Sequence, residues 1–172
     1  VLKEKNGTVL FSAPIVSEEA HESNLTVLNI KDIYKFVEIC DLNDVQEVLE
    51  RQIQMNTNIS QEGLQRNYGA NIGKVLLKAH GNDVRTRAKA RAAAGSDARM
   101  NGCELPVVIN SGSGNQGLAV SLPVIEYAEN LGVGKEKLYR ALLLANLVTL
   151  HEKAGIGRLS AYCGAVSAGA GA

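Results

Sequence analysis

The stretch from Asn110 to Gly117, Asn-Ser-Gly-Ser-Gly-Asn-Gln-Gly, constrains the fold more than any other part of the chain. It contains only small and amide residues and lies between two short, mainly apolar runs, 106–109 and 118–122. Its glycines permit positive φ and remove Cβ bulk, so consecutive N–H groups can converge on an anion at the start of the helix that follows. The sequence therefore predicts an anion-binding loop; the alternative is an ordinary surface loop.

Composition limits the kinds of protein that this chain can be. Its 172 residues fit one domain, and 45% hydrophobic residues are enough to bury a sizeable core. Aromatic residues make up 4% and Trp is absent, which suits close-packed helices better than aromatic-rich strands. Lys plus Arg equals Asp plus Glu at 18 each, so the global charge gives no reason to expect a nucleic acid or an anionic membrane as partner.

The cysteines and the apolar runs indicate the compartment. Cys40, Cys103 and Cys163 are an odd number of cysteines at wide spacing, which makes a poor disulfide framework and suits a reducing cytosol. The longest apolar run, 141–150, is too short to span a bilayer. We therefore expect a soluble, cytoplasmic protein.

Both ends of the chain indicate that it is part of a longer protein. Residues 1–11 predict two strands around an Asn6-Gly7 turn, a hairpin that normally lies inside a larger sheet. The other end, 165–172, is a run of small residues without a polar cap. We expect a fragment that continues beyond both ends; the alternative is a processed chain.

Helical patterns dominate the chain after the first 30 residues. Asn29 and Asp41 can cap helices whose apolar residues recur at helical spacing, and Ser60 can cap a further short helix. More helices are predicted over 84–94, 117–130 and 135–153.

The fold class follows from these elements. Residues 25–30 predict another strand, which would join the hairpin at the start of the chain. We expect an α+β fold that is predominantly α-helical, in which a strand-rich segment, 1–30, packs on a helical body, 31–172.

The predicted helix 84–94 carries cations at two-residue spacing, namely Arg85, Arg87, Lys89 and Arg91. On a helix this spacing spreads charge around the cylinder and does not concentrate it on one face. We interpret these side chains as a solvated surface, and the alternative is a stripe that binds nucleic acid.

Five motifs, in the same order and over nearly the whole chain, together resemble the L-cysteine desulfidase family, which is related to the α part of iron-sulfur L-serine dehydratases. They are NIKDIY (29–34), ISQEGL (59–64), ARMNGCELPVV (98–108), NSGSGNQG (110–117) and LSAYCG (159–164). The resemblance implies a 4Fe-4S lyase that converts L-cysteine to pyruvate, hydrogen sulfide and ammonia. The related dehydratases perform the same β-elimination on L-serine, and the sequence does not choose between the two substrates.

The resemblance also implies where the cluster is held. The local sequence by itself allows two interpretations of Cys163, an inert thiol or a metal ligand. In the family three cysteines hold the cluster and one iron stays open to the substrate, and Cys163 corresponds by motif to the first of these. The other two would belong to a later Cys-Asp-Gly-Ala-Lys element ending in Gly-Cys, and a cysteine proposed as the base would lie upstream of Val1. We therefore expect no catalytic base and no assembled cluster in this chain, and we interpret Cys103 as a structural thiol.

The chemistry of β-elimination indicates what the loop can do. Loss of hydroxide or hydrosulfide from Cβ needs Lewis-acid help, which an iron with an open site provides, and a base for the Cα proton. The substrate carboxylate needs a fixed anion site. The substrate-binding candidates are the loop residues with their backbone N–H groups, and Arg99 as a secondary candidate: Ser111, Gly112, Ser113, Gly114, Asn115, Gln116, Gly117 and Arg99.

Two rival interpretations remain. The stretch 113–117 is also similar to the asparagine loop of pyridoxal-phosphate-dependent dehydratases, although no Ser-x-Lys element precedes it here. The chain could alternatively be a non-catalytic small-molecule-binding or scaffolding domain. Small-residue helix faces such as 155–172 are suited to packing against the rest of the protein or against another subunit of a homo-oligomer.

Overall fold

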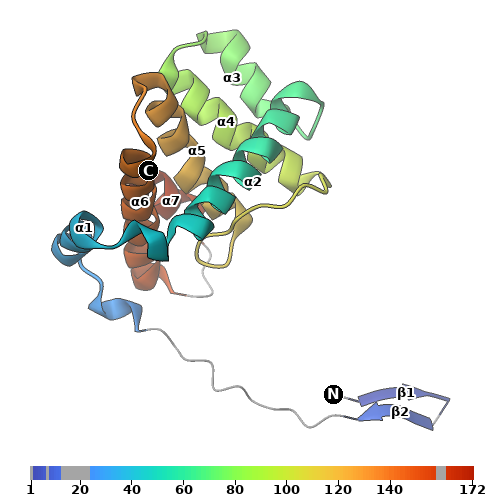
Figure 1. The fold of residues 1–172 in the computed structure, drawn as a ribbon. Coiled ribbons are helices and arrows are strands. Elements are labelled where there is room, and N and C mark those ends of the chain that lie inside the picture. Colours follow the sequence, from blue (N-terminus) through green and yellow to red (C-terminus); the bar gives the residue numbers. More distant parts are fainter. Residues whose placement is uncertain (1, 7, 13–23, 158–161) are drawn as a thin grey trace.

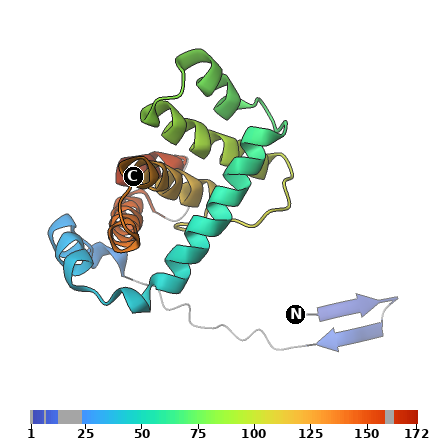
Figure 2. The ribbon, with the colours of Figure 1, turned by 45° about the horizontal axis from the view of Figure 1, so that its top comes forward.

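The computed structural model describes residues 2–6, 8–12, 24–157 and 162–172, and its body is built from helices (Figures 1 and 2). Two short 3₁₀-helices, η1 (Leu25–Val27) and η2 (Leu42–Asp44), precede the longer elements. The α-helices of the described residues are α1 (Ile30–Ile39), α2 (Gln46–Gln65), α3 (Ile72–His80), α4 (Val84–Met100), α5 (Gly114–Leu131), α6 (Lys135–Ile156) and α7 (Ala165–Gly171).

The strands do not form part of this helical body. β1 (Leu2–Lys5) pairs antiparallel with β2 (Thr8–Ser12), and among the described residues these strands contact only each other. The prediction of an α+β fold with a strand region packed on the helices is therefore wrong, and the fold is all-α.

The predicted strand over 25–30 is also wrong, because side-chain caps start helical turns there. The Asn24 side chain accepts from the N–H of Thr26 in η1. The Asn29 side chain accepts from the N–H of Asp32 at 3.0 Å and caps α1, as predicted. These local hydrogen bonds outweigh the β-propensity of a short run that has no sheet to join.

The centre of the fold is α5, which contacts α2, α4, α6 and α7. Its side chains Leu118, Val120, Leu122 and Ile125 are between 0% and 1% exposed, so the helix is enclosed on most of its circumference. The Asn110–Gly117 loop runs directly into this helix, and the most buried element of the molecule therefore anchors the loop.

Two glycines allow α2 and α3 to pack closely on α4. An ideal Cβ at Gly63 of α2 would overlap the Ala94 carbonyl, and one at Gly73 of α3 would lie 2.5 Å from the Ala90 oxygen. Helix α4 is rich in alanine, and these small side chains allow α2 and α3 to approach it closely. The prediction that Ser60 caps a separate helix is wrong, because this residue lies inside α2 and donates to the Arg91 carbonyl at 2.9 Å.

The cations of α4 do not all lie on a solvated surface. Arg91 and Glu126 of α5 are 8% and 6% exposed, and the Arg91 Nη1 lies 2.8 Å from the Glu126 Oε2. Arg87 binds the other oxygen of the same carboxylate at 2.5 Å. The interpretation as a solvated surface is therefore wrong for Arg91 and Arg87, because α5 packs on the face of α4 that carries them.

The carboxylate of Glu126 is held in its charged form by these contacts. Burial by itself raises the pKa of the Glu126 carboxyl, but the hydrogen bonds and charges of Arg91 and Arg87 outweigh burial, and the pKa lies below its ordinary value. The ion pair thus ties α4 to the central helix.

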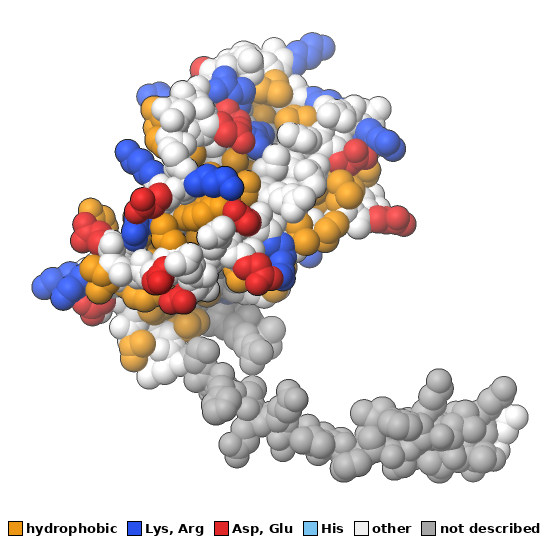
Figure 3. Space-filling view, viewed as in Figure 1, with side chains coloured by type: hydrophobic (Ala, Val, Ile, Leu, Met, Phe, Trp, Pro, Cys, Tyr) orange, Lys and Arg blue, Asp and Glu red, His pale blue; other side chains and the backbone are white. Residues whose placement is uncertain are grey.

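The outer surface carries charges of both signs. Figure 3 shows Lys and Arg side chains interspersed with Asp and Glu side chains over this face, with apolar side chains between them, so this face carries no basic stripe. None of the described helices combines the length and the apolar character that a membrane span requires.

We predict that Glu126→Gln lowers the free energy of unfolding at neutral pH by roughly 2–4 kcal/mol, because it leaves Arg91 buried with a weaker partner. The folded pKa of Glu126 is lowered, so its contribution is present above the ordinary carboxyl pKa and is lost as the pH falls through the folded value. Urea unfolding should therefore show a difference from wild type that shrinks below about pH 4. Glu136→Gln, at an exposed pair with Arg140, is the control. A difference for Glu126→Gln that stays constant with pH would contradict the assignment.

Candidate functional site

The loop before α5 is a tight turn closed by its own backbone. The N–H of Asn110 donates to the Ser113 carbonyl at 3.1 Å, and the N–H of Ser113 donates back to the Asn110 carbonyl at 3.0 Å. Between them Ser111 and Gly112 have φ of 48° and 80°. Both residues lie in the left-handed region, which glycine adopts without cost and serine rarely adopts. The turn thus holds its short segment in a strained, fixed conformation at the start of a helix.

Asn56 of α2 joins the loop segment to α5. This side chain is fully buried, and its Oδ1 accepts from the Val108 N–H at 2.9 Å. Its Nδ2 lies 3.1 Å from the Gly117 carbonyl oxygen and 2.9 Å from the Ser121 hydroxyl. One amide therefore satisfies buried polar groups on both sides of the turn.

Asn146 of α6 holds the turn from a second direction. Its Oδ1 accepts from the Asn110 Nδ2 at 2.9 Å, and its Nδ2 donates to the Gln52 Oε1 at 2.9 Å. Three amides from α2, α6 and the loop are thus linked in series. The backbone of α5 at Gly117 also lies close to the backbone of the segment before the loop, since an ideal Cβ at Gly117 would overlap the Val108 carbonyl.

No side chain of the described residues caps the N-terminus of α5. Ser113 occupies the cap position, but its side chain accepts no hydrogen bond from the helix. The N–H of Gly117 donates to the Ser113 carbonyl at 3.1 Å, which leaves the N–H groups of Gly114, Asn115 and Gln116 without partners in the helix ladder. These donors and the positive end of the helix dipole make this terminus suited to an anion.

Arg99, at the end of α4, adds a positive charge at this terminus. Its Nη1 donates to the Asn115 Oδ1 at 3.2 Å. An ideal Cβ at Gly114 would overlap the Arg99 guanidinium, so the arginine lies directly on the first residue of α5. The structure therefore brings Arg99 together with the loop. From the sequence, Arg99 was only a secondary candidate for substrate binding.

The Gln116 side chain is buried without a full set of partners. The residue is 3% exposed, and its Nε2 has no hydrogen-bond partner among the described residues. An ideal Cβ at Gly164 would overlap the Gln116 carboxamide, so the two residues are in direct contact. This contact brings Gly164, the residue after Cys163, to the first turn of α5.

The three thiols lie in different places. Cys163 is exposed, just before α7, whereas Cys40 and Cys103 are half-buried. Cys103 packs against Tyr68 in the cluster that contains Ile59 and Leu118. Among the described residues no group of three His, Cys, Asp or Glu side chains could hold a metal ion. An iron-sulfur cluster needs several cysteine ligands, so the described residues do not by themselves fit one.

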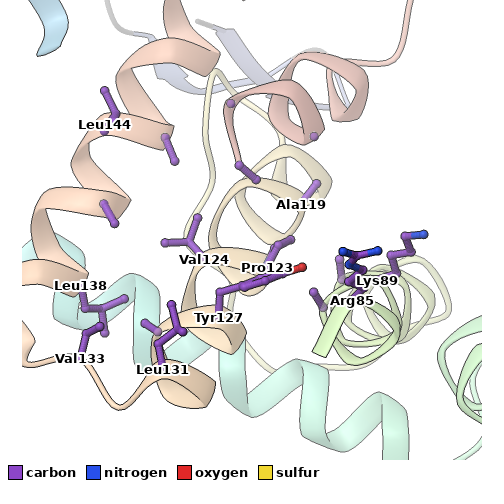
Figure 4. Close-up of a pocket in the computed structure, with 18 of the residues that line it drawn as sticks. Arg85, Lys89, Ala119, Pro123, Val124, Tyr127, Leu131, Val133, Leu138 and Leu144 are labelled. Carbon is purple, nitrogen blue, oxygen red and sulfur yellow. The ribbon is translucent and has the colours of Figure 1, made fainter. Parts of the chain in front are cut away.

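A separate groove lies on another side of α5. It has a volume of about 740 Å³ and is enclosed by α4, α5, α6 and α7 (Figure 4). Arg85 and Lys89 lie on its α4 side, while Tyr127 and Leu131 line it from α5. No residue of the 110–117 loop lines this groove, so the loop does not open on it.

The loop-supporting amides were not expected from sequence, although a signal was present. Gln52 and Asn56 share one face of α2 with Leu49 and Ile59, and all four side chains are buried. Asn146 interrupts the apolar run 141–150. Polar residues at core spacing predict buried hydrogen bonds, but not which partner they bind.

The chain is similar to known proteins over nearly its whole length. The model of one protein family, described as the serine dehydratase alpha chain, matches residues 12–172. A UPF0597 protein of Desulfitobacterium hafniense is 57% identical over 98% of this chain and 39% of its own length. UPF0597 proteins of Lachnoclostridium phytofermentans and Treponema denticola are 55% and 47% identical, over 98% and 99% of this chain and 40% and 41% of their own lengths. The chain thus spans about two fifths of these relatives. No solved structure matches it.

We predict that Asn56→Ala lowers the free energy of unfolding by roughly 2–4 kcal/mol, because it leaves the Val108 N–H and the Gly117 carbonyl without their buried partner. Asn58→Ala, at an exposed position of the same helix, should change stability by less than about 0.5 kcal/mol. Urea unfolding measures both. Hydrogen exchange at Val108 should also become faster in Asn56→Ala. Equal stability of the two variants would show that the amide does not hold the loop.

Proposed function

The chain belongs to the serine dehydratase alpha chain family, and from this premise we propose that the full-length protein is a lyase that removes the β-substituent of a small amino acid. The proposed reaction is the iron-sulfur-dependent conversion of L-cysteine to pyruvate, hydrogen sulfide and ammonia. The alternative substrate is L-serine, which the description of the family favours and which would give pyruvate and ammonia.

The uncapped N-terminus of α5 is the observation that carries this proposal. Three N–H groups, those of Gly114, Asn115 and Gln116, make no hydrogen bond within α5, and they lie at the positive end of this 18-residue helix. The Arg99 guanidinium lies beside them. An amino acid always offers a carboxylate, and this arrangement suits that group.

The residues have separate roles in the proposed site. The N–H groups of the first turn of α5 and Arg99 bind the substrate carboxylate. The Gln116 Nε2, which is buried and has no hydrogen-bond partner in the described part of the chain, is assigned as a further donor to an oxygen of the ligand. Ser111 and Gly112 form the strained turn, and the Ser111 hydroxyl donates to the Asn110 Oδ1 at 2.8 Å, so Ser111 orders the turn. The amides of Asn56 and Asn146 keep the donors fixed before substrate arrives.

Cys163 is the proposed contribution of this chain to a metal centre. The contact of Gly164 with Gln116 puts the Cys163 segment beside the proposed carboxylate site, and the thiol is exposed. One thiolate does not hold a cluster, so the remaining ligands and the base for the Cα proton would have to come from polypeptide outside this chain.

Turnover by the full-length protein tests the proposal. Anaerobically purified protein should release pyruvate with L-cysteine or L-serine, and sulfide with L-cysteine only. A faster rate with L-serine would select the dehydratase alternative. Absence of pyruvate with both substrates, from protein that contains iron, would favour a non-catalytic binding domain.

We predict that Arg99→Ala in the full-length protein raises KM for the substrate about tenfold and changes kcat less, because the cation binds the carboxylate in the ground state and in the transition state alike. Arg85→Ala is the matched control, since Arg85 lines the separate groove. Initial rates over a range of substrate concentration measure both constants. An unchanged KM in Arg99→Ala would exclude this residue from the site.

We predict that Cys163→Ser removes most of the iron from the full-length protein and abolishes sulfide release, while circular dichroism shows unchanged helix content, because serine is nearly isosteric. Cys40→Ser should spare iron and activity, since Cys40 packs against the apolar core around Ile33 and Val37. Full iron content and full turnover in Cys163→Ser would make the ligand assignment wrong.

A further inference from the structure

Gly164 is a glycine for reasons of space and not of backbone conformation. Its φ and ψ are −63° and −11°, in the right-handed helical region that every residue adopts. The residue is nevertheless buried, and an ideal Cβ would overlap the Gln116 carboxamide. The Gln116 side chain therefore occupies the space that a side chain at Gly164 would need.

The segment after Gly164 has little freedom to move away from this contact. Ala168 of α7 is fully buried against Val120 of α5 and Ala145 of α6. An ideal Cβ at Gly171 would overlap the Thr149 hydroxyl, so the far end of α7 also lies directly on α6. Because α7 is held at both points, the Gln116 contact fixes the position of its first turn.

Cys163 directly precedes this contact. Its carbonyl accepts from the Val166 N–H at 3.1 Å, which joins the cysteine to the first turn of α7. The Gln116 side chain belongs to the first turn of α5, where the proposed carboxylate site lies. The Gln116 side chain therefore connects the first turn of α5 to the residue that follows Cys163.

We propose that Gly164 is a positioning residue for Cys163, and that the Gln116 carboxamide seated on Gly164 sets the distance between the thiol and the N-terminus of α5. The importance of this distance for catalysis rests on the proposed function, whereas the coupling between Gln116 and Cys163 does not. Substitution at Gly164 should therefore change the thiol environment only when the Gln116 side chain is present.

The alkylation rate of Cys163 tests this coupling in the full-length protein. The protein is reduced, freed of metal with a chelator and treated with iodoacetamide, and mass spectrometry follows the peptide that contains Cys163. The variants are Gly164→Ala, Gln116→Ala, the double variant, and Gly169→Ala as a matched control on α7, because an ideal Cβ at Gly169 meets no atom within 4 Å.

We expect Gly164→Ala to change the alkylation rate several-fold, and Gly169→Ala to leave it at the wild-type value. In the Gln116→Ala background, Gly164→Ala should have no further effect, because the space for its Cβ is then open. Effects of the two substitutions that simply add, or a wild-type rate in Gly164→Ala, would overturn the inference.

A folding defect would not prevent the test. If Gly164→Ala alone unfolds the protein, adding Gln116→Ala should restore the helical circular dichroism signal, and a double variant that stays unfolded would overturn the inference. Failure of the proposed function has a different signature: the wild-type protein would release neither sulfide nor pyruvate, whatever the alkylation rates are.

Discussion

The buried hydrogen bonds of Asn56 are the interaction on which the site depends. They join α2 to the segment before the loop and to the first turns of α5, across 52 to 65 residues of sequence. Removing one partner would leave several buried polar groups unsatisfied, and such groups cost more than the net value of a hydrogen bond. These hydrogen bonds therefore hold the loop against the helical core that supplies this amide.

The hydrogen bonds of Asn56 explain how a helix terminus without a side-chain cap can lie beside a buried core. Free N–H groups at a helix start are normally satisfied by a side chain or by water. At the start of α5 the Ser113 side chain makes no cap hydrogen bond among the described residues, and the amides of Asn56 and Asn146 hold the turn in place. The anion site that we propose here would therefore need little reorganisation when a carboxylate binds.

The features that could be predicted from the sequence are those that depend on residues close together along the chain. The cap of α1 by Asn29 and the position of the loop at a helix start are examples, because glycines and capping amides act within a few residues. The all-α fold, the buried Arg91 and the place of Ser60 inside α2 were missed, since each depends on what packs against the residue. The roles of Asn56 and Asn146 also needed the structure, because spacing shows that a polar residue is buried but not what it binds.

The central claim is that the N-terminus of α5 binds the carboxylate of the substrate. A crystal structure of the full-length protein with L-serine tests it most directly. We expect carboxylate oxygens within about 3 Å of the N–H groups of Gly114 to Gln116, with the Arg99 guanidinium beside them. A bound L-serine whose carboxylate lies elsewhere, for example in the groove next to Arg85 and Lys89, would contradict it.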